Sequence, residues 1–299
     1  MSLMRPGPTT RTLAWEVEGG RTRSGEDTLA TEEPLEIRLV VAGSRYPVAV
    51  TMRTPGADFE LAVGFLFNEG VLATREQLRR VSYCVDKAID EQQRYNIVNV
   101  EMADGSANLA DLVHLERHFS MTSACGVCGK ATLEALHTRG YSAVPRGPEL
   151  EPDVLTSLPA KLREAQALFD RTGGLHAAGL FSADGEVVAV REDVGRHNAM
   201  DKLVGWAFLN EKLPLADHVL LVSGRSSFEL VQKSLSAGVA ALCSVSAPSS
   251  LAVDLAREFG LTLVGFLREG KFKLYSGEER VLSASARASR KAGTSGATA

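Results

Sequence analysis

The chain has 299 residues, of which 44% are hydrophobic and 23% charged, a composition typical of a folded protein of about two domains. Lysine and arginine number 33 against 37 aspartates and glutamates, so the formal charge is −4 and no basic excess favours nucleic acid or an anionic membrane. Because no segment approaches the roughly 20 apolar residues that span a bilayer and the four cysteines are too few for a disulfide framework, we expect a cytoplasmic protein with reduced thiols.

The predicted elements divide the chain into two domains between terminal tails. Residues 1–12 and 284–299 offer too little apolar surface to offset their chain entropy, so both tails are predicted to be disordered. Residues 13–118 are expected to form an N-terminal α/β domain. Residues 119–283 are expected to hold a loop with two cysteines and then a C-terminal α/β domain.

The first half of the chain begins with a predicted β-hairpin over residues 35–52, whose two strands are joined at Gly43 to Arg45. Asp58 is expected to cap a helix that Gly70 closes, since apolar residues recur between them at helical spacing. The other elements predicted in this half are strands over residues 81–85 and 95–102 and a helix over residues 109–118.

The second half has a more regular pattern. Proline and glycine in residues 144–152 indicate a loop, and Asp184-Gly185 between two apolar runs predicts a two-residue hairpin turn. Beyond it, strands and helices alternate as βαβαβ, which predicts a parallel sheet with right-handed crossovers. The predicted elements are strands over residues 176–182, 186–190, 218–222, 239–245 and 261–266, and helices over residues 131–138, 196–209, 227–237 and 250–259.

A C-x-x-C segment, S-A-C-G-V-C-G-K, contains Cys125 and Cys128 and precedes a predicted helix. A structural zinc site needs four ligands, and the other cysteines, Cys84 and Cys243, stand singly in apolar runs. A thioredoxin-like dithiol and a pair of buried structural thiols are further interpretations. A nucleophilic, sulfur-carrying thiol is favoured, because a helix N-terminus and the neighbouring Lys130 stabilise a thiolate that can attack a sulfane sulfur.

Deamination is not expected from the cysteine segment. A zinc deaminase has a proline directly before the first cysteine of its P-C-x-x-C motif, and no proline precedes Cys125. The segment therefore does not match the zinc-deaminase motif.

A second concentration of polar groups, R-E-D-V-G-R-H-N-A-M-D-K, leads from a predicted strand into a predicted helix. Capping of this helix by Asp193 or Asn198 needs far fewer ionisable groups than the seven present. We therefore expect Glu192, Asp193, Arg196 and His197 to contribute to a functional surface.

Three loops, over residues 223–227, 246–250 and 267–271, follow predicted parallel strands. Ligands of open α/β sheets bind at the carboxyl ends of strands, where helix N-termini offer free N–H groups to anions. Arginine and lysine in the first and third loops add positive charge, so these loops favour a phosphate-bearing ligand. The P-loop and the dinucleotide-binding glycine motif are both absent, which argues against an ordinary NTPase or dehydrogenase.

Seven segments between Arg53 and Gly277 together resemble the formate dehydrogenase accessory sulfurtransferase family, FdhD/NarQ. In chain order the segments are RTPGADFELAVGFLFNEG, SACGVCGK, GGLHAAGLF, REDVGRHNAMDKLVG, SGRSSFELVQK, SAPSSLAVDLA and GLTLVGFLREGKFKLYSG. The motif EDVGRHNA-DK is the most specific of these matches.

The resemblance implies a sulfurtransferase that takes persulfide sulfur from a cysteine desulfurase. It implies delivery of this sulfur to the molybdenum bis-guanine-dinucleotide cofactor, a bound substrate, which formate dehydrogenase needs for activity. In the family the first cysteine of C-x-x-C carries the persulfide, which assigns this role to Cys125 with Cys128 as its companion. The expected cofactor-binding residues are Phe266, Leu267, Arg268, Glu269, Gly270 and Lys271, with Ser223, Gly224 and Arg225 from the first strand-end loop.

The resemblance also implies the fold and the assembly. Similar proteins are homodimers with a smaller N-terminal α/β domain and a C-terminal domain of cytidine-deaminase-like fold, a three-layer α/β arrangement with a mixed sheet and no metal. Two other functions stay open. The chain could be a non-catalytic chaperone that holds the guanine-dinucleotide cofactor for insertion into formate dehydrogenase, or a dithiol reductase.

Overall fold

The computed structural model describes residues 6–86, 88–105, 143–144 and 146–281. The chain divides into two compact units, and each is described by itself. The first unit comprises residues 1–126, 166–177 and 191–212, and the second comprises residues 127–165, 178–190 and 213–299. The predicted domain boundary between residues 118 and 119 lies outside the described residues. Two later segments, residues 166–177 and 191–212, also belong to the first unit, so no single boundary in the sequence separates the two units.

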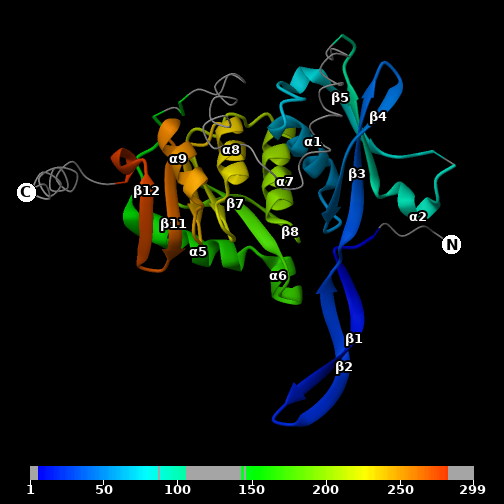
Figure 1. Ribbon diagram of the computed structural model, residues 1–299, viewed down its shortest axis with the longest axis horizontal. Helices are drawn as coiled ribbons and strands as arrows, with labels where there is room; N and C mark the ends of the chain where they lie inside the picture. Colours follow the sequence, from blue (N-terminus) through cyan, green and yellow to red (C-terminus); the bar gives the residue numbers. More distant parts are fainter. Residues whose placement is uncertain (1–5, 87, 106–142, 145, 282–299) are drawn as a thin grey trace, which may run out of the picture. The chain divides into compact units, whose positions relative to one another are not determined.

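A four-stranded sheet of order β4-β3-β6-β5 forms the centre of the first unit (Figure 1). The predicted hairpin is confirmed as β3 and β4, which pair antiparallel, whereas β3 and β6 pair parallel. Leu35, Ile37 and Leu39 alternate along β3 and are fully buried, so one face of this sheet lies in the core of the unit. The strands are β3 (Glu33–Val41), β4 (Ser44–Arg53), β5 (Leu78–Tyr83) and β6 (Ile97–Met102), with the short helices η1 (Arg75–Gln77) and α2 (Glu91–Arg94) nearby in sequence.

Helices α1 (Asp58–Asn68) and α7 (Arg196–Leu209) confirm two predicted helices and pack against each other in the first unit. Their backbones approach so closely that a Cβ atom built on Gly64 would lie 1.9 Å from a backbone oxygen of α7. A Cβ atom built on Gly205 would lie equally close, at 1.9 Å, to a backbone oxygen of α1. Glycine at both positions therefore sets the distance between the two helices.

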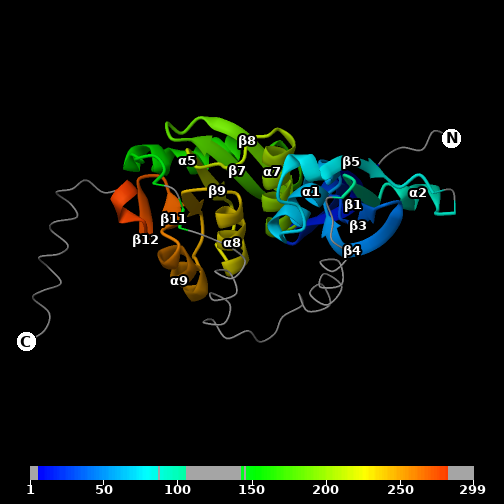
Figure 2. The same ribbon diagram turned by 90° about the horizontal axis from the view of Figure 1, so that it is seen from above.

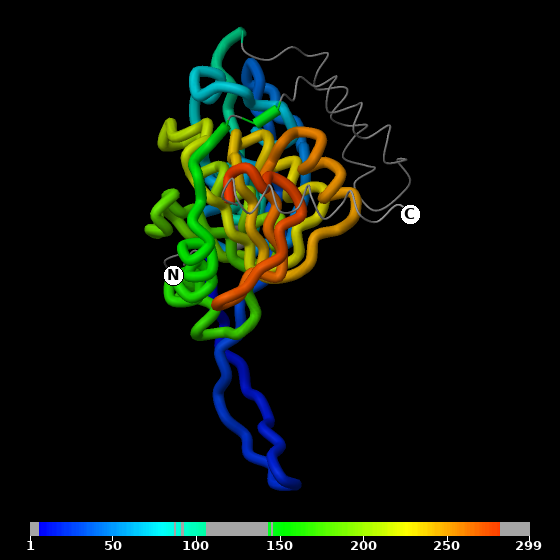
Figure 3. The backbone as a smooth tube through the Cα atoms, turned by 90° about the vertical axis from the view of Figure 1, so that its left-hand side faces the viewer, coloured from blue at the N-terminus to red at the C-terminus, as the bar shows by residue number. Residues whose placement is uncertain are grey.

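The first unit also contains an unpredicted hairpin, β1 (Thr9–Glu18) and β2 (Arg21–Ala30). It continues beyond the end of β3 and β4 as a separate ribbon (Figures 1 and 3). Gly19 and Gly20, both with positive φ, make its turn. The predicted disordered tail over residues 1–12 therefore differs from the structure at residues 9–12, which begin β1. The helix predicted over residues 109–118 lies outside the described residues.

The second unit is built on a six-stranded sheet of order β12-β11-β10-β9-β7-β8. Strands β9, β10 and β11 are parallel, as the alternating pattern predicts, whereas β7 and β12 pair antiparallel with β9 and β11. The predicted α/β class with a mixed sheet is thus confirmed, and the cytidine-deaminase-like assignment stays a prediction. The strands are β7 (His176–Ser182), β8 (Val187–Asp193), β9 (His218–Val222), β10 (Ala241–Ser244), β11 (Thr262–Arg268) and β12 (Lys271–Ser276).

Helices cover both faces of this sheet, with α8 (Phe228–Ser236) and α9 (Ser250–Glu258) opposite α5 (Pro152–Glu164) (Figure 2). Helices α8 and α9 were predicted, whereas α5, β12 and the short helices α6 (Ala167–Thr172) and η2 (Glu278–Arg280) were not. Within the described residues no helix is both long and apolar enough to cross a bilayer.

Candidate functional site

The predicted sulfur-carrying residues, Cys125 and Cys128, lie outside the described residues, so their role stays a prediction. Two other cysteines are described, and both are buried: Cys84 is 3% exposed and Cys243 is not exposed at all. Burial raises the pKa of the Cys243 thiol to about 12, because the surrounding side chains cannot solvate a thiolate. Cys243 is therefore a protonated, unreactive thiol at neutral pH, which agrees with a packing role.

Two of the three predicted strand-end loops lie side by side in the second unit. The loop after β9 meets the loop after β10 through a parallel bridge between Ser226 and Pro248, and the Ser249 N–H donates to the Ser226 carbonyl oxygen at 3.0 Å. Each loop leads into a helix, α8 or α9, and the Ser249 hydroxyl caps α9 by accepting from the Ala252 N–H at 3.2 Å. The carboxyl ends of β9 and β10 thus present two helix N-termini at one edge.

The third strand end joins this edge through Phe266, whose N–H donates to the Ser246 carbonyl oxygen at 3.0 Å. Phe266 has φ +52° at a bulge between β11 and β12, a conformation that residues other than glycine rarely adopt. Its partly exposed ring lies 4.9 Å from the Lys273 ammonium nitrogen. The bulge therefore holds an aromatic side chain beside the loop after β10.

The predicted third loop differs from the other two, because it leads into a strand rather than a helix. Arg268 pairs with Lys271 across a two-residue turn, in which Gly270 has φ +72°. This hairpin offers exposed cationic side chains but no helix N-terminus, so the expectation of free helix N–H groups here is wrong. Leu267 is completely buried, and its side chain belongs to the core rather than to a ligand-contacting surface.

The loop residue Ser226 is fully buried, and its hydroxyl oxygen finds no hydrogen-bond partner among the described residues. A buried hydroxyl without a partner is costly, so a ligand group that binds it would be favoured. Together with the exposed side chains of Arg225, Arg268 and Lys271, this edge of the sheet can bind a phosphate-bearing molecule. Within the described parts of the chain, no group of three His, Cys, Asp or Glu residues could hold a metal ion.

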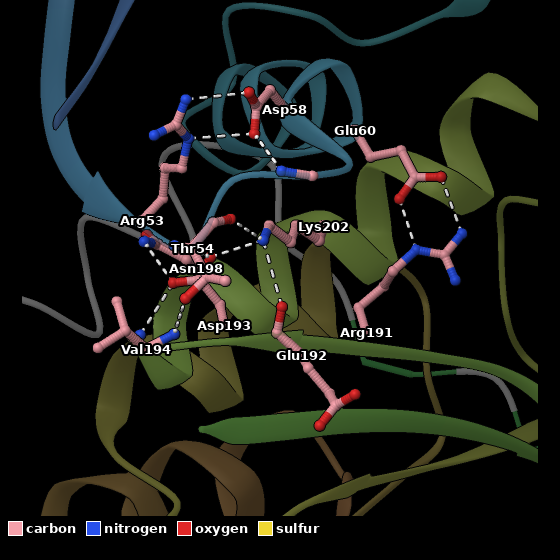
Figure 4. Close-up of polar contacts among 12 residues, drawn as sticks. Arg53, Thr54, Asp58, Glu60, Arg191, Glu192, Asp193, Val194, Asn198 and Lys202 are labelled. Carbon is pink, nitrogen blue, oxygen red and sulfur yellow. Dashed lines mark hydrogen bonds and ion pairs between the residues drawn. The ribbon is translucent and has the colours of Figure 1, made fainter. Parts of the chain in front are cut away.

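A buried ion pair lies at the junction of β8 and α7 in the first unit (Figure 4). The Lys202 ammonium lies 2.6 Å from the Asp193 carboxylate, and the two side chains are 2% and 0% exposed. Lys202 also donates to the carbonyl oxygens of Thr54 and Glu192 at 2.9 and 3.2 Å. Because Asp193 has no exposed surface, the expectation that it belongs to a functional surface is wrong.

Asp193 instead connects α7 to the segment between β4 and α1. Its carboxylate accepts hydrogen bonds from the N–H groups of Thr54 and Gly195 and from the Asn198 amide, at 3.1, 2.9 and 3.0 Å. The Asn198 amide also donates to the Met52 carbonyl oxygen at 2.7 Å. Neither predicted cap of α7 caps it, since Gly195 occupies the cap position without a side-chain bond. Asp193 and Asn198 therefore connect the start of α7 to the segment between β4 and α1.

Glu192 has a similar structural role. Its carboxylate accepts the backbone N–H groups of Leu168 and Phe169 at 3.0 and 2.8 Å, at the start of α6. An acidic side chain at a helix N-terminus compensates for the unpaired N–H groups there. Glu192, Arg196 and His197 are partly exposed, so their contribution to a functional surface stays a prediction.

Sequence reasoning missed several charged residues of the first unit that Figure 4 shows. Arg53 forms a buried two-contact pair with Asp58, at 3.1 Å for each contact, and Arg191 forms a similar pair with Glu60, at 2.5 and 2.8 Å. Asp58 was predicted to cap α1, but Ala57 occupies that position with φ +54° and the Asp58 carboxylate binds Arg53. The available signal was the charged residues of R-T-P-G-A-D-F-E, in which Arg53 pairs with Asp58 five residues later, whereas the partner of Glu60, Arg191, lies 131 residues away in sequence.

His176, at the start of β7, also belongs to the first unit. Its pKa is lowered from 6.5, first by burial and then by the positive charges of Arg196 and His197, while Asp193 opposes the shift. His176 is therefore neutral at pH 7.

Comparisons with known proteins agree with this architecture. The model of the FdhD/NarQ family matches residues 30–282. Proteins named sulfur carrier protein FdhD are similar to the chain: that of Streptomyces avermitilis is 53% identical over 275 residues (91% of this chain, 95% of the relative), and that of Mycobacterium tuberculosis is 52% identical over 259 residues (85% and 92%). A crystal structure from Desulfotalea psychrophila, described as a formate dehydrogenase accessory protein, matches with a TM-score of 0.69 at 21% identity, over 92% of this chain and 99% of that one.

Proposed function

The chain belongs to the FdhD/NarQ family, and we propose on this basis that it carries sulfur for the maturation of formate dehydrogenase. In this proposal a cysteine desulfurase is the donor. The acceptor is the molybdenum bis-guanine-dinucleotide cofactor, which the chain binds as a substrate before formate dehydrogenase receives it. The chain is a homodimeric sulfurtransferase in the cytoplasm.

One observation supports cofactor binding in the second unit: the ends of three strands converge at one edge of the sheet. Backbone bonds join the three ends through Ser226, Ser246 and Phe266, and exposed arginine and lysine side chains lie in two of the loops. The pyrophosphate of a guanine dinucleotide needs N–H donors and cations, and its base needs an aromatic or polar contact. Donors and cations are available at this edge, and the Phe266 ring lies beside them.

Sulfur uptake is a thiol–disulfide type of exchange at Cys125. The Cys125 thiolate attacks the outer sulfur of the donor persulfide, the donor's S–S bond breaks, and the donor cysteine leaves as a thiolate. Cys125 then carries the sulfur as a persulfide. Attack of the Cys128 thiolate on the Cys125 sulfur releases hydrosulfide and forms a Cys125–Cys128 disulfide, which a cellular dithiol reductant returns to two thiols.

The proposal is tested by mass spectrometry of the full chain after incubation with a cysteine desulfurase and cysteine. We expect the wild type to gain about 32 Da, the mass of one sulfur atom, and Cys125→Ser to gain none, because serine cannot form a persulfide. Cys84→Ser is the matched control and should load like the wild type, since Cys84 is buried. A Cys125→Ser chain that activates formate dehydrogenase normally would overturn the proposal in favour of a non-catalytic cofactor-insertion chaperone.

A further inference from the structure

Three basic side chains of the first unit gather at the start of α7: Arg196 and His197 from α7 itself and His176 from the start of β7. The positive charges of Arg196 and His197 both act on the His176 imidazole, so these side chains form one cluster in space, called the basic cluster below. All three are partly exposed and therefore accessible to a small ligand. The proposed sulfur-transfer steps and the converging strand ends of the second unit use none of them.

The Arg196 guanidinium carries a donor without a partner. Its Nε atom is buried and finds no hydrogen-bond acceptor within the described residues. Arg53 and Arg191 in the same unit differ, since each binds a carboxylate through two contacts. A buried donor without an acceptor costs free energy, so a ligand oxygen that accepts the Arg196 Nε–H is favoured.

The backbone at the start of α7 adds further donors. The first bond of the helix runs from the Ala199 N–H to the Gly195 carbonyl oxygen at 3.0 Å, so the N–H groups of Arg196 and Asn198 find no acceptor in the described part of the chain. Gly195, at the cap position, has no side chain that could accept them. The N-terminal end of a 14-residue helix also carries partial positive charge, which adds to the charge of the basic cluster.

The acidic residues of this segment have partners within the fold. Asp193 is fully buried, and the Lys202 ammonium balances its charge at 2.6 Å. The Glu192 carboxylate accepts two N–H groups at the start of α6. The buried Asp201 follows His197 by one helical turn, a spacing at which a carboxylate can orient an imidazole ring. The carboxylates are thus engaged inside the fold, whereas the side chains of the basic cluster are partly exposed.

The donors at this position select the class of ligand. A guanidinium group, imidazole rings and helix N–H groups together bind oxygen atoms that carry negative charge, and a tetrahedral oxyanion accepts several such bonds at once. A metal cation does not fit, because the fixed positive charge of Arg196 would repel it. We propose that the basic cluster and the first turn of α7 bind an oxyanion of the phosphate class. The inference does not rest on the proposed sulfur transfer, and its test measures anion binding.

The first experiment measures the binding of inorganic phosphate to the full chain by isothermal titration calorimetry at pH 7, with chloride at equal ionic strength for comparison. The wild type should bind phosphate but not chloride, and Arg196→Gln should bind it at least about tenfold more weakly, because a charge-assisted donor is lost. The matched control, Arg23→Gln, removes the same charge from the exposed strand β2 and should bind phosphate normally. A wild type that does not bind phosphate, or an Arg196→Gln chain with the affinity of the control, overturns the inference.

The second experiment follows the His176 imidazole of the wild type by NMR, so it does not depend on whether Arg196→Gln folds. Burial and the charges of Arg196 and His197 lower the pKa of His176, and Asp193 opposes this shift. A phosphate bound in the basic cluster offsets the two positive charges, so it should raise the pKa of His176. His218, in the second unit, is the internal control, and phosphate should not change its resonance. A pKa of His176 that stays the same when phosphate is added overturns the inference.

Free phosphate and the phosphate group of a nucleotide share this chemistry, and a third measurement distinguishes the two sources. Arg196→Gln should keep the full rise in melting temperature caused by guanine nucleotide if the ligand is free phosphate, and should reduce this rise if the ligand is a nucleotide. Arg268→Ala/Lys271→Ala should bind inorganic phosphate like the wild type. Loss of phosphate binding in that variant but not in Arg196→Gln would overturn the inference. A wild type that binds phosphate but gains no sulfur would contradict the proposed function and support this inference.

Discussion

The ammonium group of Lys202 is almost fully buried, and Asp193 together with two backbone carbonyl oxygens compensates for its charge. A buried charge keeps its ionised form only when such partners are present. The segment R-E-D-V-G-R-H-N-A-M-D-K showed that many ionisable residues are concentrated here. It did not show which are buried, because the partner Thr54 comes from a segment about 140 residues earlier. Pairing in space, rather than local spacing, decides between a surface role and a structural one.

The change Asp193→Asn should destabilise the fold strongly. It removes the carboxylate charge and leaves the buried Lys202 ammonium unpaired, which costs about 3–5 kcal/mol. The free energy of unfolding in urea measures the loss. The matched control is Glu186→Gln, which breaks the exposed Lys161–Glu186 pair and should cost about 1 kcal/mol or less. A similar small loss in both variants would contradict the structural role of Asp193.

The lowered pKa of His176 predicts a dependence of stability on pH. Between its folded value and 6.5 the unfolded chain binds the imidazole proton more readily than the folded chain does, so stability falls as the pH drops below about 6.5. His176→Gln removes the titrating group, and its free energy of unfolding should fall less between pH 7 and pH 5. Urea unfolding at several pH values measures both chains. Parallel curves would show that His176 does not contribute.

At the scale of elements, α1 and α7 touch through glycine, and this contact holds the helical layer of the first unit together. Helix–helix distance depends on the side chains at the contact. A glycine on each helix brings the backbones closer than any other residue would permit. The contact explains why glycine is used here despite its low helix propensity.

The change Gly64→Ala should separate the two helices. The added Cβ would lie 1.9 Å from the Asp201 carbonyl oxygen, and backbone on both sides must shift, so we expect a loss of roughly 3 kcal/mol in the free energy of unfolding. Gly25→Ala in β2 is the matched control, because no atom lies within 4 Å of its added Cβ and its φ is ordinary. Thermal or urea unfolding compares the two, and equal stability would refute the tight contact.

Local patterns predicted the elements that bury a regular apolar stripe or end in a distinct turn, such as the β3–β4 hairpin and the alternating elements from β9 to β11. Elements with little burial were missed, because β1 and β2 are rich in Thr, Arg and Glu and expose almost every side chain. Helix α5 carries a signal that was not used: Pro152 at its first position, followed by Leu155, Leu158 and Leu162 at helical spacing. Strand β12 was not predicted, because its first residue, Lys271, was assigned to the loop over residues 267–271.

At the scale of the whole molecule, the two expected functions depend on different parts of the chain. The convergence of strand ends could be predicted, since parallel strands place their carboxyl ends at one edge. The hairpin at Arg268–Lys271 could not be predicted from the sequence. Whether an antiparallel strand follows β11 depends on which edge of the sheet is free to pair. The predicted carrier cysteines, Cys125 and Cys128, lie outside the described residues, so their role stays a prediction from the sequence and from the family.

The last prediction separates sulfur loading from cofactor binding. Guanine nucleotide should raise the melting temperature of the wild type, and Arg268→Ala/Lys271→Ala should reduce this shift, because both exposed cations lie at the converging strand ends. Arg21→Ala/Arg23→Ala in β2 is the control, since it removes the same charge from an exposed part of the β1–β2 hairpin and should keep the full shift.

Each variant should fail in only one function. Cys125→Ser should keep the nucleotide-induced shift but gain no sulfur, whereas Arg268→Ala/Lys271→Ala should gain the sulfur normally yet fail to activate formate dehydrogenase. Differential scanning fluorimetry, intact mass and formate oxidation measure the three properties on the same preparations. If the Arg268→Ala/Lys271→Ala variant kept the full nucleotide-induced rise in melting temperature, the cofactor site would not lie at the β11–β12 turn. If the Arg268→Ala/Lys271→Ala variant also lost sulfur loading, sulfur loading and cofactor binding would share a site. Changes at two separate sites are expected to act independently of each other.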